Sequence, residues 1–370
     1  MQGTRKNRFG KLLTRLSCFS PQFLTLGPDP VVVHKRVFLG AAVAVAVLIV
    51  GSITVPAIGA ATRSHAARRR ASASSATAAS TQAAEADESR TDTQAEIALD
   101  GLAADPDADN PDVERVSDTL NEVDATFVDA SRGRTIPVTV YYPAEAGAYP
   151  LVVFAPGYAV SAATYATLEQ EVAGAGFVLV APDFPLSSTA VTSDPIRDPV
   201  AQATDVSFVI NSLLDPATRP SALADRIALT RVGVIGHSDG GITAAGVAYN
   251  SEYADSRIGA AVVLSGAEAF FPGDWFTTAS PPLLAVHGDS DEVNPFGASQ
   301  TIFDGATGPK WLVKVVGGSH LGPFTTDSSV DSVSVLVADF LRAELQGDPA
   351  AAPRVDSDAN TGSLALVAQG

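Results

Sequence analysis

The sequence predicts a doubly wound α/β domain with a mostly parallel sheet that begins with an antiparallel hairpin. Two alternating segments, Glu122–Ala130 and Thr135–Tyr142, flank a turn at Arg132–Gly133, as in a hairpin at a sheet edge. Unbroken apolar runs follow, which suit parallel strands that are covered on both faces. Helical patterns alternate with these runs, and this alternation is the order of elements in a doubly wound sheet.

The expected elements follow one another in regular order after the hairpin. Apolar runs that predict strands cover residues 149–154, 176–181, 232–235, 258–264, 282–286 and 311–316. Apolar residues spaced three and four apart predict helices over residues 163–175, 199–214, 243–249 and 331–345.

Composition divides the 370 residues into five segments, with bounds at 1–36, 37–61, 62–112, 113–346 and 347–370. The first is basic and the second is almost wholly apolar. The third is rich in Ala, Ser, Thr, Asp and Glu, so it cannot bury enough apolar surface to fold, and we expect a flexible tether. The fourth is the α/β domain. The fifth is expected to be a flexible tail, in which residues 363–367 could add a short edge strand.

The apolar segment 37–61 predicts a transmembrane signal anchor. At ~1.5 Å per residue its helix exceeds the ~30 Å hydrocarbon core of a bilayer. Basic residues before it favour a cytoplasmic N-terminus, although Arg68–Arg70 opposes this. Small residues at 57–61 leave cleavage open, and a buried core helix is the third alternative. Either a retained anchor or a cleaved signal places the domain outside the cytoplasm, membrane-anchored or secreted.

The net charge of −17 argues against nucleic-acid binding. The single cysteine, Cys18, precedes the apolar segment, so the domain carries no disulfide. It has few histidines and no His-x-x-His spacing, so we expect no metal and no cofactor. We expect a monomer.

Residues Gly236–Gly241 read Gly-His-Ser-Asp-Gly-Gly and directly follow the apolar run Arg231–Ile235. A strand that enters Gly-x-Ser-x-Gly before a helix predicts a nucleophile elbow, with Ser238 as the nucleophile. The tight turn leaves little room for a Cβ at Gly236 and Gly240 and strains the serine backbone. The hydroxyl would lie at a helix N-terminus, where negative charge is favoured.

A serine nucleophile needs a histidine base and an acid, which in this order of elements follow along the chain. His320, just after the last apolar run, is the only histidine late enough to be the base. His237, beside the serine, is expected to point away into the sheet. Asp291 is the expected acid, and Asp289 in the same loop is the alternative, which would otherwise serve as a turn residue.

The oxyanion of the reaction needs N–H donors. We expect the backbone N–H groups of Asp239, after the nucleophile, and of Tyr158, in the Ala155-Pro-Gly-Tyr158 loop. An ordinary Pro-Gly turn is the alternative for that loop. Because a carboxylate beside the oxyanion would oppose catalysis, the Asp239 side chain should turn away and bond to a backbone or polar group.

Four motifs together resemble the α/β-hydrolase superfamily, in particular its dienelactone-hydrolase-like, platelet-activating-factor-acetylhydrolase-like and bacterial cutinase (polyester hydrolase) branches. They are found at residues 156–158, 236–241, 291–295 and 317–320. The resemblance spans about 122–345 and implies an esterase without a large lid. Polyester hydrolases carry a Met where this chain has Asp239 and a Trp near the position of Ala267, and dienelactone hydrolases proper use a Cys nucleophile. A general carboxylic-ester hydrolase is therefore implied.

The expected function is hydrolysis of a small-molecule or lipid-like ester through an acyl-enzyme. A peptidase or amidase with the same triad, or an inactive cell-envelope binding module, are the alternatives. Four aromatic residues are candidates for the substrate pocket: Phe184, Phe270, Trp275 and Phe296.

Overall fold

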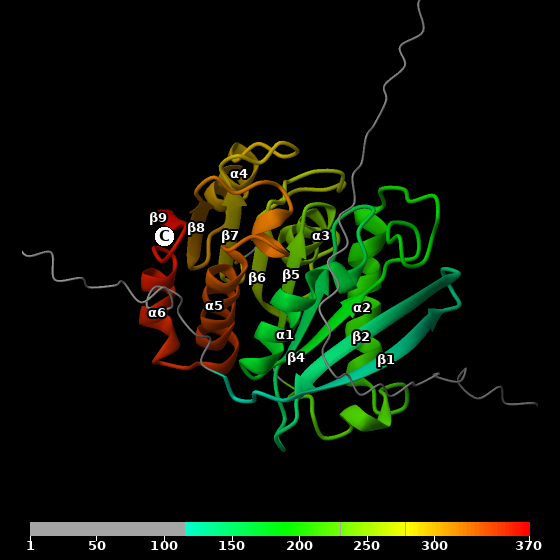
Figure 1. The fold of residues 1–370 in the computed structure, drawn as a ribbon. Helices are drawn as coiled ribbons and strands as arrows, with labels where there is room; N and C mark the ends of the chain where they lie inside the picture. Colours follow the sequence, from blue (N-terminus) through cyan, green and yellow to red (C-terminus); the bar gives the residue numbers. More distant parts are fainter. Residues whose placement is uncertain (1–114, 230, 278) are drawn as a thin grey trace, which may run out of the picture. The chain divides into compact units, whose positions relative to one another are not determined.

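The domain is built on one twisted sheet whose centre is parallel. The computed structural model describes residues 115–229, 231–277 and 279–370. Within this part of the chain, nine strands pair in the order β1-β2-β4-β3-β5-β6-β7-β8-β9 (Figure 1). Pairing is parallel from β4 through β8. It is antiparallel at the two edges, where β1 and β2 form the first hairpin and β9 pairs with β8.

The strands have the following bounds: β1 Leu120–Asp129, β2 Arg134–Pro143, β3 Leu151–Ala155, β4 Val178–Pro182, β5 Val232–His237, β6 Ile258–Leu264, β7 Leu283–Gly288, β8 Lys310–Val315 and β9 Leu364–Gln369. The α-helices are α1 Ala166–Gly174, α2 Pro199–Leu214, α3 Asp239–Tyr249, α4 Gly297–Gly305, α5 Val330–Leu341 and α6 Ala351–Asp358.

Helices cover both faces of the sheet, which explains why its central strands are apolar without alternation. Side chains of α2, α3 and α4 pack in one core cluster, and those of α1, α5 and α6 pack in another. Successive residues of β3 alternate between the two: Val153 lies in the first cluster, and Val152 and Phe154 lie in the second. Figure 1 shows α1, α5 and α6 on the near face. The expected doubly wound, mostly parallel sheet with its hairpin is therefore confirmed.

The tail is where the sequence-based interpretation is wrong. Residues 347–370 are not a flexible tail: they form α6 and β9, and β9 is the edge strand that residues 363–367 allowed. The polar composition conceals a short helix that buries Val355 and Ala359 against the α5 face, while Arg354 pairs with Asp339 of α5. A few well-placed apolar residues thus extend the domain to its last residue. Helix α4 also lay outside the predicted elements.

The predictions for residues 1–36, 37–61 and 62–112 lie outside the described residues. Among residues 115–229, 231–277 and 279–370, no helix is both long and apolar enough to cross a bilayer.

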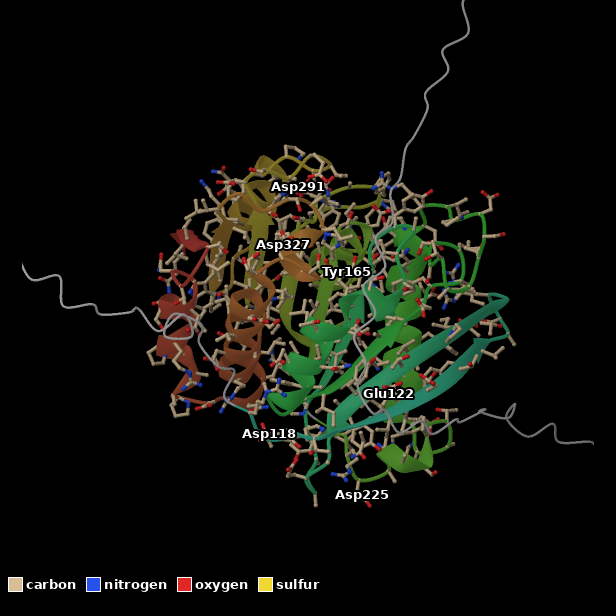
Figure 2. The ribbon with its side chains drawn as sticks, viewed as in Figure 1. Asp118, Glu122, Tyr165, Asp225, Asp291 and Asp327 are labelled. Carbon is tan, nitrogen blue, oxygen red and sulfur yellow. The ribbon has the colours of Figure 1, made fainter. Side chains whose placement is uncertain are left out.

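Parallel strands bring their carboxyl ends to one edge of a sheet, and crevices at that edge hold ligands in folds of this kind. The loops after β3, β5, β7 and β8 are those that carry the sequence-predicted site residues. Figure 2 labels Asp291, after β7, at the opposite end of the domain from Asp118 and Asp225.

Helix α1 buries the carboxyl group of Glu169, one of whose oxygens is left without a hydrogen bond from the described residues. The side chain of Glu169 is 1% exposed, and its Oε1 has no hydrogen-bond partner within the described chain. Burial, followed by the charge of Asp183, raises the pKa of Glu169 well above its usual value. The folded state therefore favours the protonated form.

We expect Glu169→Gln to stabilise the protein at pH 8 and not at pH 4. The unfolded carboxyl ionises above a pKa of ~4.3, so the stability present below that pH is lost as pH rises through the folded pKa. Glutamine mimics the neutral acid and removes this loss. Thermal melts at both pH values should show a gain of at least about 2 °C at pH 8, the shift that ~1 kcal/mol produces in a domain of this size. The matched control is exposed Glu252→Gln. Equal gains at both pH values would contradict the interpretation.

Candidate active site

The turn after β5 is a strained strand-to-helix elbow. Ser238 has φ 55° and ψ −119°, a backbone conformation that costs a non-glycine residue about 1–3 kcal/mol. A Cβ at Gly236 would lie 2.0 Å from the carbonyl oxygen of Gly240, and one at Gly240 would lie 1.9 Å from that of Ala155. Both positions therefore require glycine: Gly236 because the turn folds back on its own backbone, and Gly240 because it directly contacts the end of β3.

The structure brings the predicted serine, histidine and acid into one hydrogen-bonded row. The Nε2 atom of His320 lies 2.8 Å from Ser238 Oγ, and its Nδ1 atom lies 2.7 Å from Asp291 Oδ2. Asp289, the alternative acid, instead accepts a hydrogen bond from the Gly317 N–H at 2.7 Å. Asp289 thus orders the loop that carries His320, and the carboxylate at the imidazole is that of Asp291.

The Asp291 carboxylate is buried and fully engaged. Its side chain is 1% exposed, and Oδ1 accepts the N–H groups of Val293 and Asn294, both at 2.8 Å. Burial by itself raises the pKa of Asp291, but the hydrogen bonds from His320 and from the two backbone groups outweigh it and hold that pKa below its usual value. The ionised carboxylate at Nδ1 holds the imidazole with Nε2 turned toward Ser238 Oγ.

Two backbone N–H groups stand beside the elbow without an acceptor in the described part of the chain: those of Tyr158 and Asp239, the predicted oxyanion donors. The loop that carries Tyr158 is itself strained, since Ala159 has φ 57°. It is tied at both sides, by the Ala159 N–H to Ser187 O at 2.9 Å and by the Gly157 N–H to the Tyr165 hydroxyl at 3.2 Å.

His237 and Tyr165 form a buried link beneath the site. The ring of His237 points away from the serine: Nδ1 lies 2.7 Å from the Tyr165 hydroxyl, and Nε2 lies 2.8 Å from the backbone oxygen of His320. Because a carbonyl only accepts, Nε2 carries the proton and Tyr165 donates to Nδ1. Burial, followed by the charge of nearby His320, lowers the pKa of His237 to about 3, so the ring stays neutral.

This link joins the loop after β3 to the loop after β8, and with them the oxyanion side and the base side of the site. Sequence reasoning had not singled out Tyr165, which lies 72 positions before its partner His237. Figure 2 shows Tyr165 below the level of Asp291. No local pattern marks this tyrosine, because its role depends on a tertiary contact.

The side chain of Asp239 bonds to Arg197, the second functional candidate that the sequence analysis missed. Arg197 Nε lies 2.8 Å from Asp239 Oδ2, and the second guanidinium nitrogen bonds to Oδ1. The partner is a polar side chain, as the expectation for Asp239 required.

The four proposed pocket aromatics fall in different surroundings. Phe184 is 1% exposed in the core and does not form a pocket wall, which corrects the expectation for it. Trp275 is partly buried against the same core cluster, with its ring 5.6 Å from that of Phe271. Phe296 directly precedes α4, and its ring centre lies 5.7 Å from that of His287. Phe270 is 57% exposed and lies under the guanidinium of Arg197.

Among residues 115–229, 231–277 and 279–370, no group of three or more His, Cys, Asp or Glu side chains is placed so that it could hold a metal ion.

A family model described as chlorophyllase matches residues 114–275. The match covers the hairpin, the loop after β3 and the serine elbow, and it ends before Asp291 and His320. The chain resembles the α/β-hydrolases. The sheet order and its parallel centre fit that fold, and the resemblance drawn from the four motifs is confirmed.

The chain is also similar to several cutinases of Thermobifida species. Cutinase est1 of Thermobifida alba is 25% identical over 200 residues, which are 53% of this chain and 62% of that protein. Cutinase est2 of the same organism is 32% identical over 103 residues, 28% of this chain and 31% of that protein. Cutinase 1 of Thermobifida cellulosilytica is 34% identical over 103 residues, 28% of this chain and 36% of that protein. The matches thus span between about a third and three fifths of these relatives.

We expect Tyr165→Phe to lower kcat for ester hydrolysis by about 10- to 100-fold while KM changes little. The loss of the hydroxyl frees the Gly157 N–H and His237 Nδ1, and so loosens both loops; small misplacements of catalytic groups have effects of this size. Kinetics on a soluble ester, with a thermal melt of each variant, measure both effects.

The matched control is Tyr249→Phe. Tyr249 is also buried, and its hydroxyl lies 3.3 Å from Pro281 O at the other end of α3 from the elbow. Its loss should lower stability and leave kcat within about twofold of wild type. Equal kcat losses in the two variants would show that Tyr165 has no specific role in positioning the site.

Proposed function

We propose that this protein is a serine hydrolase that cleaves carboxylic esters through an acyl-enzyme intermediate. The observation that carries the proposal is the continuous row of hydrogen bonds from Asp291 through His320 to Ser238. The comparisons support an ester hydrolase at the level of the family. The identity of the nucleophile and the route of the reaction are our proposal.

In the proposed first step, Ser238 Oγ attacks the ester carbonyl while His320 Nε2 takes the hydroxyl proton. Asp291 holds the imidazole in the required tautomer and stabilises the cation that forms. The developing oxyanion accepts the N–H groups of Asp239 and Tyr158. The intermediate then collapses, its C–O bond to the alkoxide breaks, and His320 gives its proton to the alkoxide, which leaves as the alcohol. The acyl group remains bonded to Ser238 Oγ.

In the second step, His320 takes a proton from a water molecule, whose oxygen attacks the acyl carbon. The tetrahedral intermediate collapses, the bond to Oγ breaks, and the proton returns to Ser238 as the carboxylic acid is released. Each oxyanion donor is expected to contribute ~2.7–4 kcal/mol to the lowering of the barrier. Partial burial of the row supports this electrostatic role, since Ser238 and His320 are each 9% exposed.

We expect a fluorophosphonate probe to label the wild-type protein and Ser238→Ala to lose both labelling and turnover of p-nitrophenyl esters. The probe reacts only with a hydroxyl that a base has activated. Intact-protein mass spectrometry and initial rates give the two readouts, with Ser265→Ala as a control at a buried serine that also has positive φ.

Three outcomes separate the candidate functions. Ester cleavage without cleavage of the matched p-nitroanilides supports the esterase. Comparable rates on both substrates favour the peptidase or amidase alternative. A folded wild-type protein that neither labels nor turns over esters of short and medium chain length would leave the inactive envelope-binding module.

We further propose that the domain acts outside the cytoplasm, either anchored through residues 37–61 or secreted after cleavage, on a small-molecule or lipid-like ester. The support is the sequence alone. If the anchor is retained, the full chain expressed in its host should remain with membranes after alkaline carbonate extraction, and protease added to spheroplasts should digest the domain. A soluble chain protected from protease would contradict both forms of the proposal.

A further inference from the structure

In the proposed reaction, the negative charge of the Asp239 carboxylate lies close to the oxyanion and would oppose its formation. The backbone N–H of Asp239 is an oxyanion donor, so its carboxylate belongs to the residue directly beside the developing negative charge. The side chain is 1% exposed and cannot be screened by solvent. A carboxylate in the first turn of α3 is favoured by the helix dipole, but it cancels part of the field that the same helix end offers to an oxyanion.

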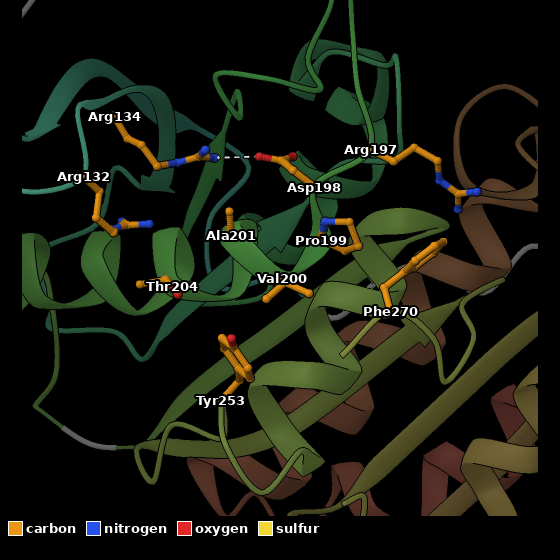
Figure 3. Close-up of a pocket in the computed structure, with 10 residues that line it drawn as sticks. All are labelled: Arg132, Arg134, Arg197, Asp198, Pro199, Val200, Ala201, Thr204, Tyr253 and Phe270. Atoms are coloured by element: carbon orange, nitrogen blue, oxygen red, sulfur yellow. Dashed lines mark hydrogen bonds and ion pairs between the residues drawn. The ribbon is translucent and has the colours of Figure 1, made fainter. Parts of the chain in front are cut away.

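The guanidinium of Arg197 makes a bidentate contact with the Asp239 carboxylate. Its Nε bonds to one carboxylate oxygen at 2.8 Å and a second guanidinium nitrogen bonds to the other. The hydrogen bond and charge of Asp239 raise the pKa of Arg197, against the opposing effect of partial burial. The guanidinium also lies 4.8 Å from the centre of the Phe270 ring, and Figure 3 shows the two side chains next to each other. Arg197 is thereby held from two directions.

The segment around Arg197 also contacts the other oxyanion residue. The Tyr158 hydroxyl donates to the backbone oxygen of Pro195 at 3.0 Å. The side chains of both donor residues therefore hold the same three residues, Pro195–Arg197, which we call the strap. The strap is fixed further by the Ile196 N–H to Leu186 O at 2.7 Å. It leads directly into α2, whose start at Asp198 and Pro199 is visible in Figure 3.

We propose that Arg197 is a positioning residue of the oxyanion hole: it neutralises the Asp239 carboxylate, keeps that carboxylate turned away from the oxyanion and, through the strap, fixes Asp239 relative to Tyr158. This inference rests on the proposed esterase function. It explains how an acid can follow the nucleophile. Since the oxyanion carries its charge in the transition state, Arg197 affects kcat much more than KM.

Three variants test the charge role. Arg197→Met should lower kcat for a p-nitrophenyl ester by about 100-fold, comparable with the loss of one oxyanion donor, because it leaves a buried carboxylate unpaired beside the site. Asp239→Asn alone should change kcat only a few-fold, since the half-exposed guanidinium finds water. The double variant, which has no charge at either position, should recover kcat to within about 10-fold of wild type.

The recovery is the decisive result, because loss of a structural contact would make the double variant at least as slow as Arg197→Met. A kcat for Arg197→Met within twofold of wild type would overturn the inference, and so would a double variant that stays 100-fold slow. A many-fold gain in Asp239→Asn would show that the carboxylate does face the oxyanion and would equally overturn it.

Arg354→Met is the matched control. Arg354 makes the same kind of bidentate contact with Asp339 on the α5–α6 side of the sheet: its Nε lies 2.6 Å from Oδ2, and a second guanidinium nitrogen lies 2.9 Å from Oδ1. It should lose stability and keep kcat. If Arg197→Met does not fold, Arg197→Lys is the alternative, because it keeps the positive charge and loses the two-point contact with the carboxylate. The kcat of Arg197→Lys should lie between that of wild type and the value expected for Arg197→Met. A wild-type kcat in Arg197→Lys that does not rise when Asp239→Asn is added would reject the positioning role.

Failure of this inference is distinguishable from failure of the proposed function. A wild-type protein that neither labels with fluorophosphonate nor hydrolyses esters defeats both. An active wild type with an equally active Arg197→Met leaves the esterase in place and defeats only the role of Arg197.

Discussion

The backbone contact between the serine elbow and the end of β3 is the constraint on which the site depends. Gly240 approaches Ala155 so closely that a single methyl group would collide with its carbonyl oxygen. That contact holds the strained Ser238 in place and sets the loop after β3, which carries Tyr158, beside the start of α3 at Asp239. A strained residue persists only where its surroundings over-determine it, and here both flanking glycines provide that restraint.

Around this contact, the loops are joined by hydrogen bonds between partners far apart in the chain. Tyr165 and His237 tie the loop after β3 to the loop of His320. Asp289 ties the β7 and β8 loops together, and Asp291 meets His320 across the same pair. The site is therefore assembled from separate loops that share buried polar partners, each of which would be costly to leave unpaired. Rigidity of this kind suits a reaction that relies on preorganised donors.

Asp239 marks the point at which this chain uses a different local solution from that implied by the family resemblance. In the proposed reaction, a carboxylate beside the nucleophile requires compensation, and the contact of Arg197 with both oxygens would supply it from a segment that also meets Tyr158. In this arrangement, the buried negative charge of Asp239 is balanced by one half-exposed arginine. That dependence links the loop before α2 to the chemistry, although this loop carries none of the reacting groups.

The sequence by itself determined the hairpin, the parallel strands from β3 to β8 and the helices α1, α2, α3 and α5, together with the elbow at Ser238 and the choice of His320. Hydrophobic period, glycine spacing and chain order are local properties, which is why these features could be predicted. It favoured Asp291 and kept Asp289 as the alternative, since both lie in one loop and only the path of that loop decides which carboxylate reaches the imidazole. The polar composition of residues 347–370 led to the wrong prediction of a flexible tail. The few apolar side chains of this segment are enough to order it, because α6 packs against α5 and β9 pairs with β8. Tyr165 and Arg197 were found only in the tertiary structure, because their roles arise from partners 72 and 42 positions away and leave no local pattern.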